Sequence, residues 1–562
     1  MEEIRAKLAG IIEKLFAVKA EVKVVAAPEN TAADYATNVA MQLAKVVHKN
    51  PMVIAEMIQA EFEKEGGEYT VAVAAPGFLN FVVDERAIMT QALNYAENLA
   101  GEVTDESYAG KTVVAEFSDP NPFKVLHVGH LYTSVVGDSI SRLIEQAGGK
   151  VVRANFGGDV GLHVAKTIYA LQKKEGKEDF SYFLSKLTIE DIAKCYVEGT
   201  GAYEEDEQAK AEITRLNKEI YRINAEDEHE SELAQMYWRG RELSYEYFED
   251  FYAQIGVKFD KYYPESAVAD KGVEEVKAHA GTTYEESDGA IVYKGEKVGL
   301  HTRVFINREG VPTYETKDVG LIFTKWEDWK FDESVVVTGN EQTDYMRVVL
   351  ASVAEYAPQL VERTTHLTHG LVKLPGNVKM SSRKGNFLKA VDVLQMIEGM
   401  VHHEKVLALA AIKYAFLKYK MGGDIVFDPM ESVSTTGNSG IYLLYSAVRA
   451  KKILQKCKEG GAIAEDGGGR ELGEAEGREQ EKVLAKKIVQ YAEVLKEAVR
   501  EKAPYKICTY LYELAQEFSR FYENVKVAGN AREAELARLV QAYLNVMEHG
   551  LGLLGIEVPE EM

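Results

Sequence analysis

The chain has 562 residues, of which 46% are hydrophobic, 28% charged and 10% aromatic. This length exceeds what one hydrophobic core usually supports, so we expect two to four domains. No apolar run approaches the roughly 20 residues that a membrane-spanning helix needs, and the acidic, amphipathic start does not resemble a signal peptide. These features argue against a membrane protein and predict a cytoplasmic one.

The chain is acidic, with 89 acidic residues against 66 basic ones and a formal net charge of −23. Bulk charge alone disfavours a nucleic-acid partner, but phosphate contacts need only a local basic groove. The three cysteines, Cys195, Cys457 and Cys508, form no CxxC pair. We therefore expect neither a disulfide framework nor a structural zinc site, and no metal-ligating residues.

The first block, residues 1–107, has the pattern of a small α/β domain. Helical periodicity at residues 4–15 and 34–62 is interrupted by Asn50-Pro51. Residues 69–77 and 78–84 then alternate as two strands around the turn at Pro76-Gly77.

The second block, residues 108–400, has the pattern of a parallel-sheet domain. A buried strand at 111–118 precedes a helix at about 131–146, and a second strand from residue 150 ends in a glycine-rich loop. Strand, helix and strand in this order predict a βαβ unit of a doubly wound, Rossmann-like sheet. A helical insertion is expected at about 166–299, and strands resume at 334–341 and 365–374.

The third block, residues 401–562, has almost only helical periodicity and predicts an all-helical bundle. Its glycine-rich segment 460–469 is interpreted as a solvated linker between two helices. The fold class is therefore multidomain α/β: a small N-terminal domain, a parallel-sheet domain with a helical insertion, and a C-terminal bundle.

The most informative short motif is "HVGH" at residues 127–130, between a strand and a helix. A metal site would need a third ligand, for which His163 is the nearest candidate. Burial for packing alone fits poorly at a strand-to-helix loop. A nucleotide site explains more, because a helix start favours phosphate and imidazoles donate hydrogen bonds to it.

A second motif, "KMSSRKGN" at residues 379–386, supports the nucleotide interpretation. Lys379, Arg383 and Lys384 stand among small residues and suit a departing pyrophosphate. Alone, this segment would more often be a solvated basic loop. Together with "HVGH" about 250 residues earlier in a doubly wound domain, it indicates ATP chemistry.

The two motifs resemble the HIGH and KMSKS motifs of class I aminoacyl-tRNA synthetases. The surroundings, including "EFSDPNPFKVLHVGH", "APGFLNF" and "GNSGIYLLYSAVRA", are similar to the arginyl-tRNA synthetase family over essentially the whole chain. This resemblance implies that the first block is an additional tRNA-binding domain and the third an anticodon-binding domain. It assigns catalysis to Lys124, His127, Gly129, His130, Lys379, Ser381, Ser382, Arg383 and Lys384.

The resemblance also implies an arginine pocket. Its acids, Glu116 and Asp318, suit a planar guanidinium, which pairs bidentately with carboxylate. Tyr314 lies one helical turn before Asp318 and would contact the substrate's aliphatic stem. The groups expected around the amino acid's own amino and carboxylate ends are Ser118, Asn121 and Gln342.

The implied reaction is ligation of L-arginine to tRNA(Arg) in two steps. The arginine carboxylate attacks the α-phosphate of Mg²⁺-bound ATP, and a ribose hydroxyl of the tRNA then accepts the arginyl group from the adenylate. We expect a monomer without membrane contacts. A catalytically inactive tRNA-binding paralogue is the alternative. The intact "HVGH", Lys124, Glu116 and Asp318 argue against it, and ATP–pyrophosphate exchange with each amino acid, with and without tRNA, is the test.

The sequence departs from the family pattern at two places. Ser382 stands where KMSKS has its second lysine, and Lys124, three residues before His127, is expected to compensate by contacting phosphate. Val160 replaces a tryptophan that is commoner in the family, which leaves the pocket shape near Asp159 open.

Contacts with tRNA are also assigned by the resemblance. Aromatic and sulfur-containing side chains suit the stacking of unpaired bases, and arginine can stack or bind phosphate. The anticodon is expected at Tyr445, Arg449, Tyr522 and Met562, and the D-loop at Phe78 and Asn80.

Overall fold

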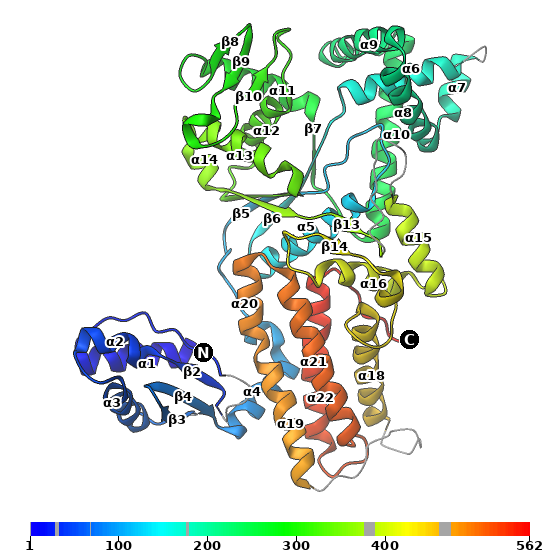
Figure 1. The fold of residues 1–562 in the computed structure, drawn as a ribbon. Coiled ribbons are helices and arrows are strands. Elements are labelled where there is room, and N and C mark those ends of the chain that lie inside the picture. Colours follow the sequence, from blue (N-terminus) through cyan, green and yellow to red (C-terminus); the bar gives the residue numbers. More distant parts are fainter. Residues whose placement is uncertain (1, 28–32, 68, 176–178, 376–387, 460–473) are drawn as a thin grey trace. The chain divides into compact units, whose positions relative to one another are not determined.

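The structure is a computed structural model in which contacts divide the chain into two compact units (Figure 1). Unit 1 comprises Met1–Glu102, Ile453–Gln490 and Glu517–Asn545, and unit 2 comprises Val103–Lys452, Tyr491–Gln516 and Val546–Met562. The described residues are all except 1, 28–32, 68, 176–178, 376–387 and 460–473. The glycine-rich segment 460–469 and the "KMSSRKGN" motif therefore lie outside the described residues.

Unit 1 contains a small α/β module built on an antiparallel sheet of order β1-β2-β4-β3. Apolar residues one helical turn apart, such as Leu8 and Ile12, face the sheet and are fully buried with Leu79 and Phe81 of β4. The elements are α1 (Glu2–Phe16), β1 (Val25–Ala26), β2 (Tyr35–Thr37), α2 (Val39–Val47), α3 (Pro51–Lys64), β3 (Tyr69–Ala74) and β4 (Phe78–Val83). The two strands expected around Pro76-Gly77 are confirmed.

The remainder of unit 1 is helical. Helix α4 (Glu85–Glu102) packs against α19 (Glu474–Val489), and the buried Tyr95 lies on α4. The amide of Asn545 donates to the carbonyl of Tyr95 at 2.9 Å, and Arg532 pairs with Glu481 at 2.8 Å. Unit 1 thus contains parts of helices from the third block of the sequence.

The centre of unit 2 is a five-stranded sheet of order β12-β11-β5-β6-β7 in which every pairing is parallel. Consecutive residues of a strand point to opposite faces, and both Val113 and Val114 of β5 are fully buried. Both faces of the sheet are therefore covered, which confirms the doubly wound class. The strands are β5 (Thr112–Glu116), β6 (Lys150–Gly157), β7 (Lys261–Pro264), β11 (Glu333–Gly339) and β12 (Thr364–His369).

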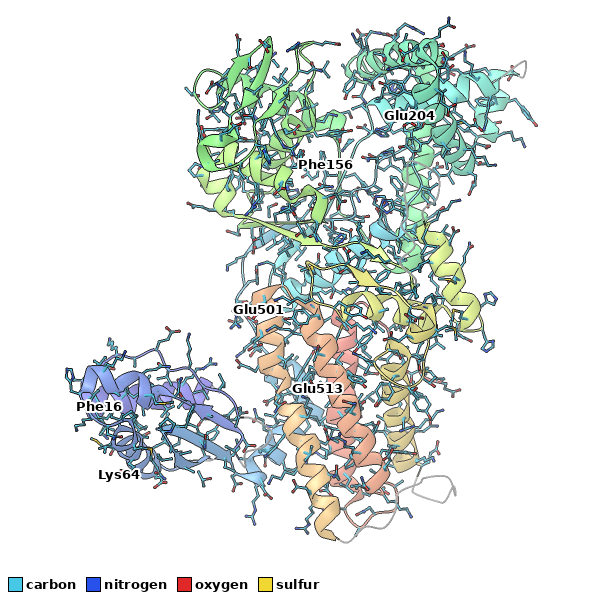
Figure 2. All side chains as sticks on the ribbon, in the orientation of Figure 1. Phe16, Lys64, Phe156, Glu204, Glu501 and Glu513 are labelled. Carbon is cyan, nitrogen blue, oxygen red and sulfur yellow. The ribbon has the colours of Figure 1, made fainter. Side chains whose placement is uncertain are left out.

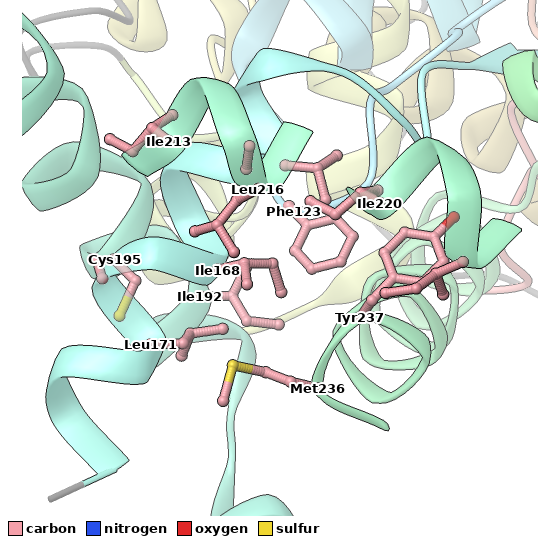
Figure 3. Close-up of a cluster of buried hydrophobic side chains, with 14 of the residues drawn as sticks. Phe123, Ile168, Leu171, Ile192, Cys195, Ile213, Leu216, Ile220, Met236 and Tyr237 are labelled. Atoms are coloured by element: carbon pink, nitrogen blue, oxygen red, sulfur yellow. The ribbon is translucent and has the colours of Figure 1, made fainter. Parts of the chain in front are cut away.

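An insertion follows β6 and begins as a helical subdomain with its own core. Figure 3 shows this core, in which Phe123 of the loop after β5 joins Ile168, Leu216 and Tyr237. The helices are α6 (Leu162–Glu175), α7 (Phe180–Lys186), α8 (Ile189–Glu205), α9 (Glu207–Ala225) and α10 (Glu232–Ile255). The expectation of helix as far as residue 299 needs correction, because β7 at 261–264 returns to the main sheet beside β6.

A second, antiparallel sheet of order β10-β9-β8 lies between β7 and β11 in the chain. Its apolar residues form one core with the following helices, including Tyr293, Phe305 and Val319. The elements are α11 (Glu265–Ala278), β8 (Glu285–Ser287), β9 (Ala290–Tyr293), η1 (Gly295–Val298), β10 (Arg303–Ile306), α12 (Tyr314–Trp329), η2 (Asn340–Gln342), α13 (Thr343–Ala354) and α14 (Pro358–Glu362).

The helices of the third block confirm its helical character, and several belong partly to unit 2. The hydroxyl of Ser139 on α5 donates to the carbonyl of Leu553 at 2.9 Å, and the ammonium of Lys413 donates to the carbonyl of Gly555 at 2.6 Å. Side chains of unit 2 thereby satisfy carbonyls at the end of α22. The elements of this block not yet named are α16 (Lys405–Leu417), β14 (Ile425–Val426), α17 (Pro429–Ser432), α18 (Gly440–Lys458), α20 (Tyr491–Glu501), α21 (Pro504–Asn524) and α22 (Glu533–Leu553). The second block also contains α5 (Val128–Gln146), β13 (Val372–Lys373) and α15 (Ala390–Met400).

Candidate active site

The loop after β5 lies at the carboxyl edge of the parallel sheet, where ligands of doubly wound folds bind. Side chains of this loop are tied to β6, to the segment directly after it and to α10. The Ser118 hydroxyl lies 2.8 Å from that of Tyr252, the Asp119 carboxylate accepts from the backbone N–H of Phe156 at 2.8 Å, and the Asn121 amide oxygen accepts from Gly158 at 2.8 Å. Figure 2 shows Phe156 on β6. Polar contacts with these neighbouring elements thus hold the loop in place.

The predicted "HVGH" motif forms the start of α5. His127 is the N-cap, and its Nδ1 accepts from the backbone N–H of Gly129 at 3.1 Å. His130 reaches back, so that its Nδ1 accepts from the backbone N–H of His127 at 3.2 Å. A Cβ atom at position 129 would come within 2.8 Å of the His127 ring, so glycine is required for the ring to lie there.

The protonation state of both imidazoles follows from this capping. Burial, followed by the charge of Lys124, lowers the pKa of His127 to about 4. Burial and the neighbouring His127 and Lys124 lower the pKa of His130 well below its usual value. In a neutral ring whose Nδ1 accepts, the proton resides on Nε2. Both histidines therefore present Nε2–H donors, as a phosphate oxygen requires.

The metal interpretation of the motif finds less support. His163, the third ligand that it would need, has its Nε2 2.8 Å from the carbonyl of Gly158. Within the part of the chain that the structure describes, no three His, Cys, Asp or Glu side chains gather as a metal site would require. The geometry favours phosphate over metal.

Lys124 is half-buried next to the histidines. Its ammonium lies 5.1 Å from the centre of the Tyr196 ring. Its positive charge lowers the pKa of His127, His130 and His163, in addition to the larger effect of their burial. This is a position from which a cation can reach the same ligand as the imidazoles.

The second motif's predicted residues, Lys379, Ser381, Ser382, Arg383 and Lys384, lie outside the described residues. The residues that follow the motif are tied to the first one. The backbone N–H of Val128 donates to Leu388 at 2.9 Å, and that of Ala390 donates to Leu126 at 2.9 Å. Leu388, the first described residue after the motif, therefore lies beside the start of α5.

The predicted guanidinium acids occupy different electrostatic surroundings. Glu116, at the end of β5, is buried and accepts from the ammonium of Lys325 at 2.5 Å, and Lys325 also contacts Ser334 at 3.1 Å. Asp318, on α12, is also buried and accepts from the hydroxyl of Tyr345. Burial and the charges of Glu116 and Glu265 raise the pKa of Asp318 well above its usual value.

Glu265, a third buried acid at this edge, was not predicted from the sequence. It begins α11 directly after β7 and accepts from the ammonium of Lys317 at 2.6 Å. A Cβ atom at Gly158 would meet Asn121 Oδ1 at 2.7 Å and Glu265 Oε1 at 3.0 Å, so the two side chains border one space. Its position directly after a strand could have identified it, had β7 been assigned to the main sheet.

The other residues predicted for the arginine pocket, Tyr314 and Gln342, lie on different elements. Tyr314, the first residue of α12, is 60% exposed, and the ammonium of Lys317 lies 5.2 Å from its ring centre. Gln342 is exposed in the 3-10 turn that follows β11. Tyr314, Asp318 and Lys317 share the first turns of one helix, whereas Gln342 comes from the next strand end.

The departure from the family pattern at Val160 has a structural context. Val160 is buried in the core of the helical insertion. Asp159 beside it is fully buried and accepts from Arg241 at 2.9 Å and from the Ser266 hydroxyl at 2.7 Å. The loop is therefore fixed by an ion pair on one side of residue 160 and by apolar packing at it.

The residues expected to contact tRNA fall in both units. In unit 2, Tyr445 is 43% exposed, and the Arg449 guanidinium lies 4.7 Å from its ring centre. Met562 is 39% exposed, and Glu560 near it pairs with Lys451 on α18 at 2.8 Å. An exposed tyrosine backed by arginine is a surface on which a base can stack.

In unit 1, Phe78 and Asn80 lie on β4 two residues apart, so they share one face of the strand. Phe78 is 37% exposed, whereas Leu79 and Phe81 on the opposite face are fully buried. Tyr522 is partly buried near the end of α21.

Comparisons with known proteins give first the class and then the family. Residues 91–428 match the family described as "tRNA synthetases class I (R), catalytic domain". Residues 2–83 match "Arginyl tRNA synthetase N terminal domain", and residues 443–562 match "DALR anticodon binding domain". The chain belongs to the arginyl-tRNA synthetase family of the class I synthetases.

Relatives and solved structures agree with this assignment. The arginine–tRNA ligase of Clostridium botulinum is 30% identical over 583 residues, covering 98% of this chain and 96% of that protein. The one of Treponema denticola is 30% identical over 482 residues, covering 81% and 80%. The fold is similar to that of the arginyl-tRNA synthetases of Thermus thermophilus (TM-score 0.79, 23% identity, both chains fully covered) and Plasmodium falciparum (TM-score 0.75, 19% identity, 100% and 99% covered).

No helix among the described residues combines the length and the apolar character that a bilayer crossing would require.

Proposed function

We propose that this protein ligates L-arginine to tRNA through an arginyl-adenylate formed from ATP. The observation that carries the proposal is the start of α5, where two stacked, neutral imidazoles present Nε2–H donors at the carboxyl edge of a parallel sheet that also bears buried acids. A triphosphate and a cationic amino acid are the two ligands that such an edge accommodates. Family membership supports the same reaction.

The histidines and Lys124 are assigned to Mg²⁺-bound ATP. As the arginine carboxylate attacks the α-phosphorus, charge grows on the phosphate oxygens, and fixed donors stabilise it without reorganising. Lys124 supplies a full positive charge beside them, in place of the lysine that Ser382 replaces. The departing pyrophosphate is assigned to the basic residues of the second motif, as the sequence predicts. The chain needs no covalent intermediate of its own, since positioning and charge stabilisation suffice.

Arginine is assigned to the space bordered by Asn121, Glu265 and Asp318. Glu116 and Glu265 are already paired with lysines. Of the three acids, Asp318 is therefore the one whose pairing with a guanidinium would be most favourable electrostatically. Tyr314 would cover the aliphatic stem. Ser118, Asn121 and Gln342 would hold the amino and carboxylate groups.

Unpaired tRNA bases are assigned to Tyr445, Arg449, Tyr522 and Met562, and the D-loop to Phe78 and Asn80. Solvent-exposed aromatic rings support stacking, because every base offers a π-face. The tRNA's terminal ribose would meet the adenylate at the sheet edge.

The test is aminoacylation of total tRNA with each of the 20 standard amino acids in turn, together with ATP–pyrophosphate exchange in the presence and absence of tRNA. Charging with arginine alone is expected, with exchange that requires tRNA. Charging with another amino acid would overturn the proposal. Binding of tRNA with no charging at all would favour the inactive paralogue instead.

The proposal extends to a monomer that acts in the cytoplasm on tRNA(Arg). The monomeric state and the cytoplasmic location stay predictions. Sedimentation of the purified chain at assay concentration tests the first, with a mass near that of one chain expected, and fractionation of cells tests the second.

A further inference from the structure

The acid proposed to bind arginine differs from its neighbours in what it contacts. Glu116 and Glu265 each accept from a buried lysine, Lys325 and Lys317 respectively. For Asp318, no lysine or arginine among the described residues comes within ion-pair distance, and its carboxylate accepts from the hydroxyl of Tyr345. Asp318 therefore accepts from a hydroxyl where the two glutamates accept from an ammonium.

Tyr345 has a second contact, through its ring. It lies in the first turn of α13, and the guanidinium of Arg303 on β10 lies 5.5 Å from its ring centre. Arg303 also pairs with Glu315 on α12 at 3.0 Å, three residues before Asp318. The ring is thus placed by contacts with two elements, and it aims its hydroxyl at Oδ2 of Asp318.

This contact matters because a guanidinium is planar and pairs with both oxygens of a carboxylate in one plane. A carboxylate rotates freely about its last bond unless a donor fixes one oxygen. Since each carboxylate oxygen can accept two hydrogen bonds, the tyrosine occupies one site and leaves the others to the ligand.

We propose that Tyr345 is a positioning residue that determines specificity for arginine by fixing the plane of the Asp318 carboxylate and favouring its ionised form. The proposal rests on the role of Asp318 in the proposed function. The residues that face Asp318 besides Tyr345 and set the charge around it are Glu116, Asp119, Glu265, Glu315 and Lys325.

The test is steady-state aminoacylation with Tyr345→Phe, which removes the hydroxyl and keeps the ring. The KM for arginine should rise about tenfold, the loss expected for a hydrogen bond to a charged group. The kcat and the KM for ATP should change less than about twofold, because the hydroxyl touches neither the phosphates nor the reacting carboxylate. A KM for arginine equal to that of the parent would overturn the proposal.

A pH series adds a readout that mere loss of packing would not move. Arginine binding requires ionised Asp318, so its KM should rise as pH falls. Without the hydroxyl, which stabilises the ionised form, this rise should begin at a higher pH. An identical pH profile in the variant and the parent would contradict the proposal.

The matched control is Tyr293→Phe, which removes another tyrosine hydroxyl from a carboxylate, at 3.0 Å from Glu355. It should leave the KM for arginine unchanged. If Tyr345→Phe fails to fold, Arg303→Met is the second variant, because it removes the cation–π contact with the Tyr345 ring. It should raise the KM for arginine about threefold at unchanged kcat. An unchanged KM would equally overturn the proposal.

Asp318→Asn separates this inference from the proposed arginine site. A rise of about a hundredfold or more in the KM for arginine is expected, because an amide cannot pair with the guanidinium as an ion. If Asp318→Asn leaves the KM unchanged, the proposed arginine site itself is wrong. If only Asp318→Asn raises it, the site stands and the role of Tyr345 is wrong.

Discussion

The imidazole rings of His127 and His130 stack with their centroids 3.8 Å apart and their planes inclined by 18°. Each ring uses Nδ1 to accept a backbone N–H within the same capping turn. The pair thereby completes the first turn of α5 and leaves the proton of each neutral ring on Nε2. One arrangement serves both the helix start and the proposed contact with ATP.

Removing either donor should slow adenylate formation. For His127→Asn and His130→Asn we expect kcat to fall by about 10²–10³-fold, the range for one fixed donor to a developing charge, with the KM for arginine nearly unchanged. Tritiated-arginine charging measures both constants. The exposed His229 in the insertion provides the control His229→Asn, and a loss of activity there equal to that of the motif variants would count against the assignment.

The pH dependence of kcat should carry no histidine limb near neutrality. Because the pKa of His127 is lowered from 6.5 to about 4, the ring stays neutral from about pH 8 down to about pH 5 and loses its role only below that. At saturating arginine and ATP, kcat should thus stay flat through pH 6.5. A limb centred at pH 6.5 that disappears in His127→Asn would show that the ring is protonated in the normal range.

Lys124→Ala should lower the rate of adenylate formation about a hundredfold while leaving tRNA affinity nearly unchanged. The physical reason is loss of a full positive charge beside the two donors. Filter binding of tRNA and single-turnover adenylate formation measure the two quantities. Lys173, whose ammonium lies 5.0 Å from the Tyr169 ring, gives a matched lysine-to-alanine control in the insertion. An unaltered rate in Lys124→Ala would reject its role.

The buried pair of Glu265 and Lys317 should show strong coupling. Removing one partner leaves an uncompensated buried charge, so Glu265→Gln or Lys317→Met should each lower the unfolding free energy by about 3–5 kcal/mol. The double variant should lose less than either single change. Urea unfolding of the four proteins completes the cycle, and simple additivity would show that the pair is not coupled.

Tyr445→Ala should weaken tRNA binding without affecting arginine activation. Loss of one stacked base corresponds to about 1–3 kcal/mol, or roughly 5- to 150-fold in Kd. Tyr445→Phe keeps the π-face and should bind tRNA like the parent. Equal weakening by both substitutions would point to the hydroxyl rather than to stacking.

Much of the architecture could be predicted from local pattern alone. Strand, helix and strand periodicity around residues 111–157 predicted the parallel sheet, and the flanking blocks predicted the α/β module and the helices. This was possible because apolar residues recur every two residues on the buried face of a strand and every 3.6 residues on that of a helix. The residues of "HVGH", Lys124 and Asp318 could be proposed because they stand in contiguous motifs that resemble those of the family, and their roles stay predictions. The second motif's contacts lie outside the described residues, and its assignments stay predictions.

By itself the sequence determined the fold class, the family and the contiguous motifs, since these depend on neighbours along the chain. Only the tertiary structure decided the pairing of the charges. Strand β7 returns beside β6 after a hundred-residue insertion and brings Glu265 against Lys317, while α12 brings Lys325 to Glu116. Periodicity records which face of an element is buried but not which element buries it. For that reason the partners of Glu116 and Asp318, and the importance of Tyr345, became visible only in three dimensions.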